Sequence, residues 1–164
     1  MTSNHEISVL FVCLGNICRS PLAEGVLLHR LAEAGLSDRV YVDSAGTGSW
    51  HVGQRPDARS IAVAAKHGVE LPGSARRVRL EDFFEFQFVL AMDGSNLEDL
   101  KGLESGSEAD AVIRLLLEFD PEAAGELDVP DPYYGGPDGF DKVYEMVDRA
   151  CEALVEHLEQ ELGA

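Results

Sequence analysis

The sequence predicts an α/β protein: one three-layer domain with a four-stranded, mostly parallel central sheet flanked by helices on both faces. Apolar segments alternate with segments of helical periodicity, as in consecutive strand–helix–strand units. The 164 residues suffice for one domain with a sizeable core and are too few for two ordinary ones. A glycine-bearing loop follows the first apolar segment, where such sheets bind ligands. We therefore expect a single domain over 1–164.

The first strand and the first helix are separated by a short loop. "ISVLFVC" (7–13) is a nearly unbroken apolar run, typical of a strand buried on both faces. "PLAEGVLLHRLAEAG" has apolar residues at helical spacing and ends at Gly35. Pro21 falls in the first turn of this helix, where its missing N–H costs nothing.

Two further strands are expected in the middle of the chain. "VYVDSAG" (40–46) is the second strand, and "FQFVLAMD" (86–93) is the third, with a short helix near "SNLEDLKG". Between them, "DARSIAVAAKHG" (57–68) predicts a helix that Asp57 caps and Gly68 ends.

The last third of the chain predicts a strand, a long loop and a helix. "DAVIRLLLEF" (110–119) also fits a helix, but we favour a fourth strand. Residues 121–140 are rich in proline and glycine and are expected to form a loop. Residues 141–162 have the spacing of an amphipathic helix packed against a core. Cys13 and Asp93 both fall at the carboxyl ends of predicted parallel strands, where ligands bind.

The net charge of −17 excludes several classes of partner. Residues 1–80 contain nine basic and seven acidic side chains, a net +2, whereas residues 81–164 contain four and 23, a net −19. Binding to nucleic acid or an anionic membrane relies on Lys and Arg, so we expect neither partner. The acidic half is interpreted as a solvated surface that keeps the protein soluble.

The sequence also indicates a cytoplasmic protein. No apolar stretch approaches the roughly 20 residues that span a bilayer, and the start "MTSNHEIS" does not have the pattern of a secretion signal. Leaderless secretion stays an alternative. The three cysteines (Cys13, Cys18 and Cys151) form an odd count, which argues against a disulfide framework and suggests a reducing compartment.

The segment "FVCLGNICRSP" (11–21) has the features of a reactive anion-binding loop. Loop N–H groups and a helix N-terminus together attract an anion, and the forked guanidinium of Arg19 can bind two oxygens of a tetrahedral oxyanion. The same surroundings favour the thiolate form of Cys13, a nucleophile aimed at phosphorus. A buried, inert thiol is the alternative for a lone cysteine. The combination with Arg19 and Ser20-Pro21 argues against it.

At these residues the chain resembles the low-molecular-weight protein tyrosine phosphatases. The matching segments follow in order and cover nearly the whole chain: "VCLGNICRSP" (12–21), "VDSAGT" (42–47), "SWHVGQRPD" (49–57), "AMDGSNL" (91–97) and "DPYYGG" (131–136). The bare Cys-x5-Arg spacing is shared by unrelated phosphatases. The longer pattern, which includes Asn16 and the late Asp131-Pro132, is much more specific.

The resemblance implies a role for each matching residue. Cys13 would attack phosphorus and form a phosphocysteine intermediate, while Arg19 would bind the phosphoryl oxygens. Ser20 would hydrogen-bond the thiolate, and Asp131 would protonate the leaving phenol and then activate water. Ser44 would support the loop through hydrogen bonds. The phosphate-binding loop would comprise Leu14, Gly15, Asn16, Ile17, Cys18 and Ser20.

The resemblance also implies the substrate. Trp50, Tyr133 and Tyr134 match positions at the entrance and would hold a phenyl ring by stacking. Relatives that act on phosphoarginine carry threonine at the place of Ile17, and the bulkier isoleucine favours an aryl substrate. We therefore expect a phosphotyrosine-bearing protein as substrate, for example an autophosphorylating tyrosine kinase, with inorganic phosphate as product. We expect a monomer that needs no metal or other cofactor.

Three points stay open at this stage. Cys18 is either a small packing residue or a redox partner that forms a reversible disulfide with Cys13. Vertebrate members brace the loop with a histidine where this chain has Gly73, and we assign no site role to any histidine. The alternatives to a tyrosine phosphatase are an arsenate reductase of the same fold, a protein arginine phosphatase, a non-catalytic phosphotyrosine or sulfate binder and, more weakly, a zinc site at Cys13 and Cys18.

Overall fold

Four parallel strands form the centre of the computed structural model, which describes residues 5–133, 135–136 and 138–163. In chain order the elements are β1 (Ile7–Cys13), α1 (Arg19–Glu33), β2 (Val40–Gly46), α2 (Ala58–Lys66), α3 (Asp82–Glu85), β3 (Phe88–Ala91), α4 (Gly94–Glu104), β4 (Val112–Leu115), the 3-10 helix η1 (Leu116–Phe119) and α5 (Asp138–Leu162). The strand order is β2-β1-β3-β4, and all three pairings are parallel. The predicted fold class is confirmed.

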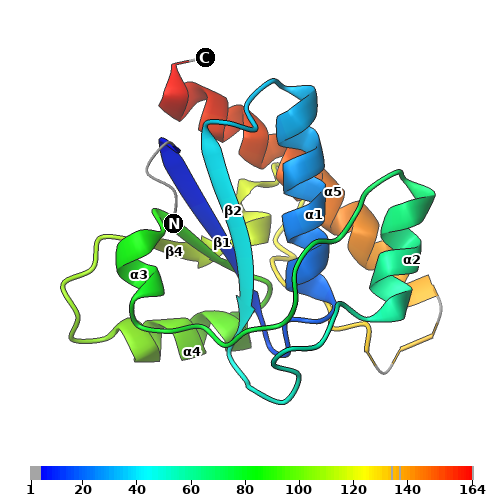
Figure 1. The fold of residues 1–164 in the computed structure, drawn as a ribbon, viewed down its shortest axis with the longest axis horizontal. Coiled ribbons are helices and arrows are strands. Elements are labelled where there is room, and N and C mark those ends of the chain that lie inside the picture. The colour runs from blue at the N-terminus through cyan, green and yellow to red at the C-terminus, as the bar shows by residue number, and fades with distance from the viewer. Residues whose placement is uncertain (1–4, 134, 137, 164) are drawn as a thin grey trace.

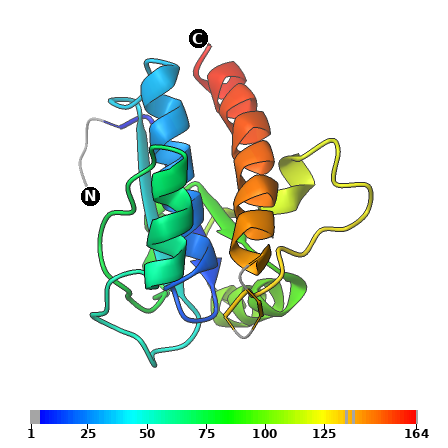
Figure 2. The same cartoon turned by 90° about the vertical axis from the view of Figure 1, so that its right-hand side faces the viewer.

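Helices cover both faces of the sheet, giving three layers (Figure 1). α1, α2 and α5 lie side by side on one face, as Figure 2 shows, and α3 and α4 pack on the other. Side chains of β1 alternate between the two layers. Val9 and Phe11 belong to the core on the α1 and α5 side, whereas Leu10 and Val12 belong to the core on the α3 and α4 side. This explains the nearly unbroken apolar run of β1, since both of its faces are buried.

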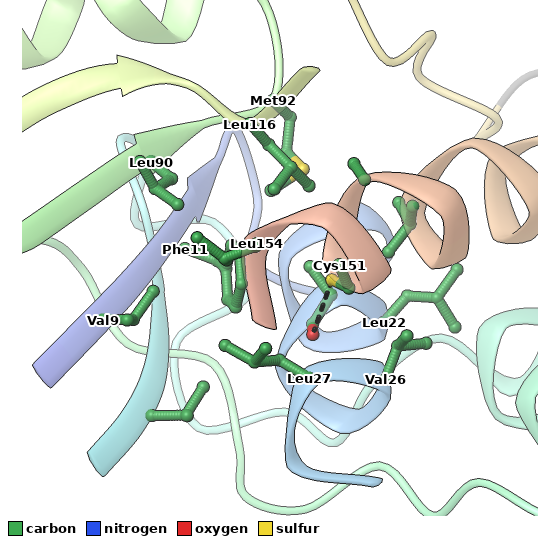
Figure 3. Packing of buried hydrophobic residues seen from close by; sticks show 14 of the residues in the cluster. Val9, Phe11, Leu22, Val26, Leu27, Leu90, Met92, Leu116, Cys151 and Leu154 are labelled. Atoms are coloured by element: carbon green, nitrogen blue, oxygen red, sulfur yellow. Dashed lines mark hydrogen bonds between the residues drawn. The ribbon is translucent and has the colours of Figure 1, made fainter. Parts of the chain in front are cut away.

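The larger core lies between β1, α1 and α5 (Figure 3). Leu22 and Leu27 of α1 and Leu154 of α5 have no exposed surface, and they pack beside Phe11 of β1. Cys151 is also fully buried, with its sulfur 3.9 Å from the carbonyl oxygen of Ala23. The third cysteine is therefore part of the core between the two helices.

The ends of several helices follow the predicted signals. The Asp57 carboxylate accepts a hydrogen bond from the backbone N–H of Arg59 (2.8 Å) and caps α2. Gly68 follows that helix with φ of 75°, a left-handed conformation that glycine adopts without strain. Asp93 caps α4 in the same way, because its side chain accepts from the N–H of Asn96 (2.8 Å).

The expected strand over 110–119 is wrong in its second half. β4 ends at Leu115, and η1 follows directly. The Glu118 carboxylate accepts a hydrogen bond from the N–H of Leu115 (2.7 Å), which closes the turn and buries Leu116 and Leu117. In addition, α5 begins at Asp138, within the expected loop, and the single-turn helix α3 was not predicted. No helix in the described part of the chain is long and apolar enough to span a bilayer.

Candidate active site

The loop between β1 and α1 has an unusual backbone conformation that buried hydrogen bonds hold in place. Asn16 has φ of 56°, and its side chain is almost completely buried. The Asn16 amide nitrogen donates to the hydroxyls of Ser20 (2.8 Å) and Ser44 (3.0 Å). Its amide oxygen accepts from the backbone N–H of Arg76 (3.0 Å). Three separate segments thus stabilise the left-handed residue on which the shape of the loop depends.

Close backbone packing positions the same loop against β2. The N–H of Thr47 donates to the carbonyl of Cys13, and that of Gly48 donates to the carbonyl of Leu14, both at 2.9 Å. A Cβ atom on Gly46 would lie 2.8 Å from the carbonyl oxygen of Leu14. Any side chain at Gly46 would therefore push the loop away from the end of the sheet.

The Cys13 sulfur lies at the base of this loop among hydrogen-bond donors. The sulfur lies 3.0 Å from the hydroxyl oxygen of Ser20 and accepts a hydrogen bond from the N–H of Asn16 (3.3 Å). The Ser20 hydroxyl accepts from the Asn16 amide, so its single hydrogen can go to the sulfur at 3.0 Å or to the carbonyl of Ala45 at 3.4 Å, and the sulfur is the nearer of the two. These donors suit a sulfur that carries negative charge.

Cys18 has a different environment although it belongs to the same loop. Burial, followed by the nearby Asp57, raises the pKa of the Cys18 thiol to about 12. Cys18 is therefore a neutral thiol at physiological pH. It lines the same pocket as Cys13.

Arg19 is buried, and its guanidinium is fixed by the protein. One terminal nitrogen, Nη1, donates to the Asp93 carboxylate (2.6 Å) and to the carbonyl of Val129 (2.9 Å). The other, Nη2, lies 3.7 Å from an oxygen of Asp131. Burial by itself lowers the pKa of Arg19, but Cys13, Asp93 and Asp131 more than offset this and leave the pKa above its ordinary value. The positive charge is thus retained inside the fold.

A pocket of about 310 Å³ opens above the loop. Its lining contains nearly all the residues expected from the sequence: Cys13, Leu14, Gly15, Ile17, Cys18, Arg19, Trp50, Asp131 and Tyr133, together with His51. Tyr134 lies outside the described residues. Asn16, Ser20 and Ser44 do not line the pocket. Their side chains form the buried hydrogen bonds that hold the loop in place.

The pocket walls come from two loops that are far apart in sequence. Trp50 is 71% exposed and folds over Gly48, where a Cβ atom would lie only 1.9 Å from the indole ring. On the other side, the Asp131 carboxylate accepts a hydrogen bond from the N–H of Tyr133 (3.0 Å). The acid and an aromatic wall are therefore parts of one turn.

His51 lies at the pocket, although the sequence analysis assigned no site role to any histidine. It lines the pocket, and its ring lies 6.2 Å from that of Tyr133. A Cβ atom on Gly15 would lie 3.0 Å from the His51 ring, so the glycine permits this close approach. Its position next to Trp50 in the sequence was the available signal.

Glu24 was missed by the sequence analysis. Its buried carboxylate accepts a hydrogen bond from the Ser44 hydroxyl at 2.6 Å and so continues the network behind the loop. Burial raises the pKa of Glu24 to about 7. Gly73 is exposed, and among the described residues the hydrogen bonds that support the loop run from Asn16 through Ser44 to Glu24 and include no histidine. One signal was available: Glu24 follows Ser20 by one helical turn and therefore shares its face of α1.

Arg59 was also missed, and it connects the two halves of the site. Its guanidinium binds the Asp57 carboxylate (3.0 Å) and donates to the carbonyl of Tyr133 (3.1 Å). It lies 5.3 Å above the Tyr133 ring and 4.7 Å above that of Phe140. The Asp57 N–H donates to the carbonyl of Ile17 (2.7 Å). The β1–α1 loop and the Asp131 turn are thus joined through the start of α2.

The described residues contain no group of three His, Cys, Asp or Glu side chains that could hold a metal ion. The Cys13 thiol, the Arg19 guanidinium and the Asp131 carboxylate line the pocket together.

Comparisons with known proteins agree with this arrangement. The family model for low molecular weight phosphotyrosine protein phosphatase matches residues 8–164. A low molecular weight protein-tyrosine-phosphatase of Streptomyces coelicolor is 48% identical over 148 residues, 90% of each chain. A protein tyrosine phosphatase of Entamoeba histolytica superposes with a TM-score of 0.89 at 37% identity, covering 94% of this chain and 98% of the other.

A third relative differs in its named activity. An arginine phosphatase of Drosophila superposes with a TM-score of 0.86 at 36% identity, covering 92% of this chain and 97% of the other. Family model, sequence relatives and solved structures all span almost the whole chain. This protein therefore belongs to the low-molecular-weight phosphotyrosine protein phosphatases, a family of phosphoric monoester hydrolases.

Proposed function

We propose that residues 1–164 act as one catalytic domain that hydrolyses phosphotyrosine in proteins, and small aryl phosphates, through a phosphocysteine intermediate. The observation that carries this proposal is that the Cys13 thiol, the Arg19 guanidinium and the Asp131 carboxylate line a single pocket. A nucleophile, a fixed positive charge and a proton donor are what transfer of a phosphoryl group from an aryl ester requires. No metal or cofactor has a part in this scheme.

In the first step the Cys13 thiolate attacks phosphorus. The S–P bond forms as the P–O bond to the phenol breaks, and Asp131 transfers its proton to the departing oxygen. The loop N–H groups and Arg19 bind the three phosphoryl oxygens. Because Asp93 and Val129 already hold Arg19 through Nη1, its Nη2 can meet the charge without a rearrangement of the guanidinium.

In the second step water hydrolyses the intermediate. The ionised Asp131 takes a proton from the water, whose oxygen attacks phosphorus as the S–P bond breaks, and inorganic phosphate is released. The departing sulfur regains its negative charge. The Ser20 hydroxyl, 3.0 Å from the Cys13 sulfur, stabilises that charge by donating a hydrogen bond.

Aromatic and apolar walls favour phosphotyrosine over other phosphorylated residues. Trp50 and Tyr133 line the pocket and offer faces to a phenyl ring, while Ile17 contributes an apolar side chain to the same wall. Phosphoarginine is the competing substrate, since a relative of 36% identity is an arginine phosphatase. The apolar Ile17 disfavours the polar guanidinium of that substrate.

The proposed setting is a monomer in the cytoplasm that acts on phosphotyrosine proteins, among them an autophosphorylating tyrosine kinase. An arsenate reductase that passes its oxidation to a late pair of cysteines is disfavoured, because Cys151 is the single later cysteine of the chain and is fully buried. We further propose that Cys18 protects the nucleophile. Peroxide converts the Cys13 thiolate to a sulfenic acid, and the Cys18 thiol displaces its hydroxyl as water to form a disulfide.

The test is a set of steady-state rates on p-nitrophenyl phosphate, a phosphotyrosine peptide and a phosphoarginine peptide. The wild-type protein should hydrolyse the two aryl phosphates, with a much lower rate on phosphoarginine. Cys13→Ser should be inactive, and Asp131→Asn should lose most activity on substrates with poor leaving groups. A wild-type protein that hydrolyses neither aryl phosphate, or full activity of Cys13→Ser, would overturn the proposal.

A further inference from the structure

A second hollow lies directly beside the catalytic pocket and shares two of its walls. It has a volume of about 580 Å³. Leu14 and Trp50 line both hollows, so the two adjoin at these side chains. We call this second hollow the side groove. Its remaining main contributors are Arg77, Val78, Asp99 and Leu103.

The side groove gathers apolar surface that is exposed to solvent. Leu14 is 41% exposed, Trp50 is 71% exposed and Leu103, near the end of α4, is 42% exposed. Isolated exposed apolar side chains are ordinary on protein surfaces. Three of them converging on one hollow that adjoins a catalytic pocket indicate a binding site for apolar substrate groups.

The polar groups of the side groove lie at positions that suit a peptide main chain. Arg77 uses Nε to donate to the carbonyl of Thr47 (3.2 Å), and no carboxylate of the described residues forms an ion pair with it. Its remaining N–H groups can donate to a peptide carbonyl. Asp99 is exposed on α4 and can accept from a peptide N–H.

The geometry points to a subsite for a bulky apolar side chain, such as leucine, located two residues from the phosphotyrosine of the substrate. This inference rests on the proposed function, because it assumes that a phosphotyrosine occupies the catalytic pocket. In an extended peptide, side chains of residues two positions apart point to the same side and are about 7 Å apart. When the phosphotyrosine points into the catalytic pocket, the side chain two positions away therefore points into the side groove. The side chain one position away points to the opposite side of the peptide.

The experiment uses phosphotyrosine peptides with an alanine background and one leucine placed at −2, −1, +1 or +2. We expect leucine on one side, at −2 or +2, to raise kcat/KM by about tenfold, which corresponds to about 1.4 kcal/mol from burial of one apolar side chain. Leucine at −1 and +1 should change it less than about twofold. Equal kcat/KM for all four peptides would overturn the subsite.

Substitution at the groove locates the effect. In Leu103→Ser the ratio of kcat/KM for the leucine peptide to that for the alanine peptide should fall to about 1–3. The ratio is measured on one enzyme sample, so any change in the chemical step cancels. Leu80→Ser is the matched control, because Leu80 has a similar exposure of 43% and lies outside the groove. An unchanged ratio in Leu103→Ser would refute the assignment.

p-Nitrophenyl phosphate separates the two proposals, because it has no flanking residues. Its hydrolysis by the wild-type protein together with equal rates on all peptides would reject only the subsite. Absence of its hydrolysis would reject the phosphatase mechanism itself.

Discussion

Replacing Glu24 by glutamine should make the stability of the protein less sensitive to pH. The Glu24 carboxyl is 8% exposed and accepts a hydrogen bond from Ser44. Burial, which is the main cause, and the nearby Asp43 raise its pKa to about 7 from an ordinary 4.5, against the opposing effects of Ser44 and Arg76. The folded state therefore holds this proton more tightly than the unfolded state does.

The protein therefore becomes less stable as the pH rises and Glu24 ionises. The contribution of Glu24 to the free energy of unfolding is fully present below pH 4.5 and is lost as the pH rises to about 7. At ~1.4 kcal/mol per pH unit, the rise of the pKa from 4.5 to about 7 gives a full loss of about 3.5 kcal/mol, and about 2.5 kcal/mol of it falls between pH 5 and pH 8. Glutamine does not ionise, and its amide oxygen can still accept from Ser44. Relative to the wild type, Glu24→Gln should therefore gain about 2.5 kcal/mol between pH 5 and pH 8.

Urea unfolding followed by circular dichroism at both pH values measures this difference. The wild type and Glu24→Gln are compared at each pH, so that other titrating groups cancel. Glu33→Gln is the control, because Glu33 is on the same helix with a side chain that is 66% exposed. If the difference in free energy of unfolding between Glu24→Gln and the wild type is the same at pH 5 and pH 8, ionisation of the buried Glu24 does not lower the stability and the reasoning is refuted.

Two further substitutions test the links around the pocket. Arg59→Ala removes the contact with the Tyr133 carbonyl and should reduce kcat/KM about tenfold on aryl phosphates with poor leaving groups, with less than about twofold change on good ones. Arg59→Lys should recover little of the lost kcat/KM, because lysine lacks the guanidinium fork that binds Asp57. If Arg59→Ala lost the same kcat/KM on all leaving groups, a role of Arg59 in positioning Asp131 would be contradicted. For Cys18→Ser, activity recovered with dithiothreitol after peroxide treatment should be much lower than in the wild type, and equal recovery would argue against a Cys13–Cys18 disulfide.

The sheet and its helices could be predicted because their signals are local. β1 is buried at every position and apolar at all but Ser8, since helices cover both of its faces, and Asp57 and Gly68 mark the ends of α2 through their own conformational preferences. β4 lacks such a signal. It lies at one edge of the sheet, is largely exposed and continues into the apolar η1 without a break in sequence pattern. The turn there depends on one side-chain hydrogen bond from Glu118, which periodicity does not reveal.

The same distinction holds for the candidate site. Cys13 and Arg19 are six positions apart, and their loop can be read directly as an anion cradle. Arg59 meets Tyr133 across 74 positions, and Arg19 meets Asp93 across 74 as well. Such contacts depend on how the layers pack and have no local pattern. Glu24 is intermediate, because an acidic residue on the buried face of α1 is already an anomaly in the sequence.

The position of Trp50 has a practical consequence. It is the single tryptophan of the chain, and it is mostly exposed where the catalytic pocket and the side groove meet. Intrinsic fluorescence excited at the indole band therefore arises at the mouth of the site and not in the hydrophobic interior. Occupancy by an unlabelled ligand can be titrated by emission alone, without an added dye or a competing chromophore.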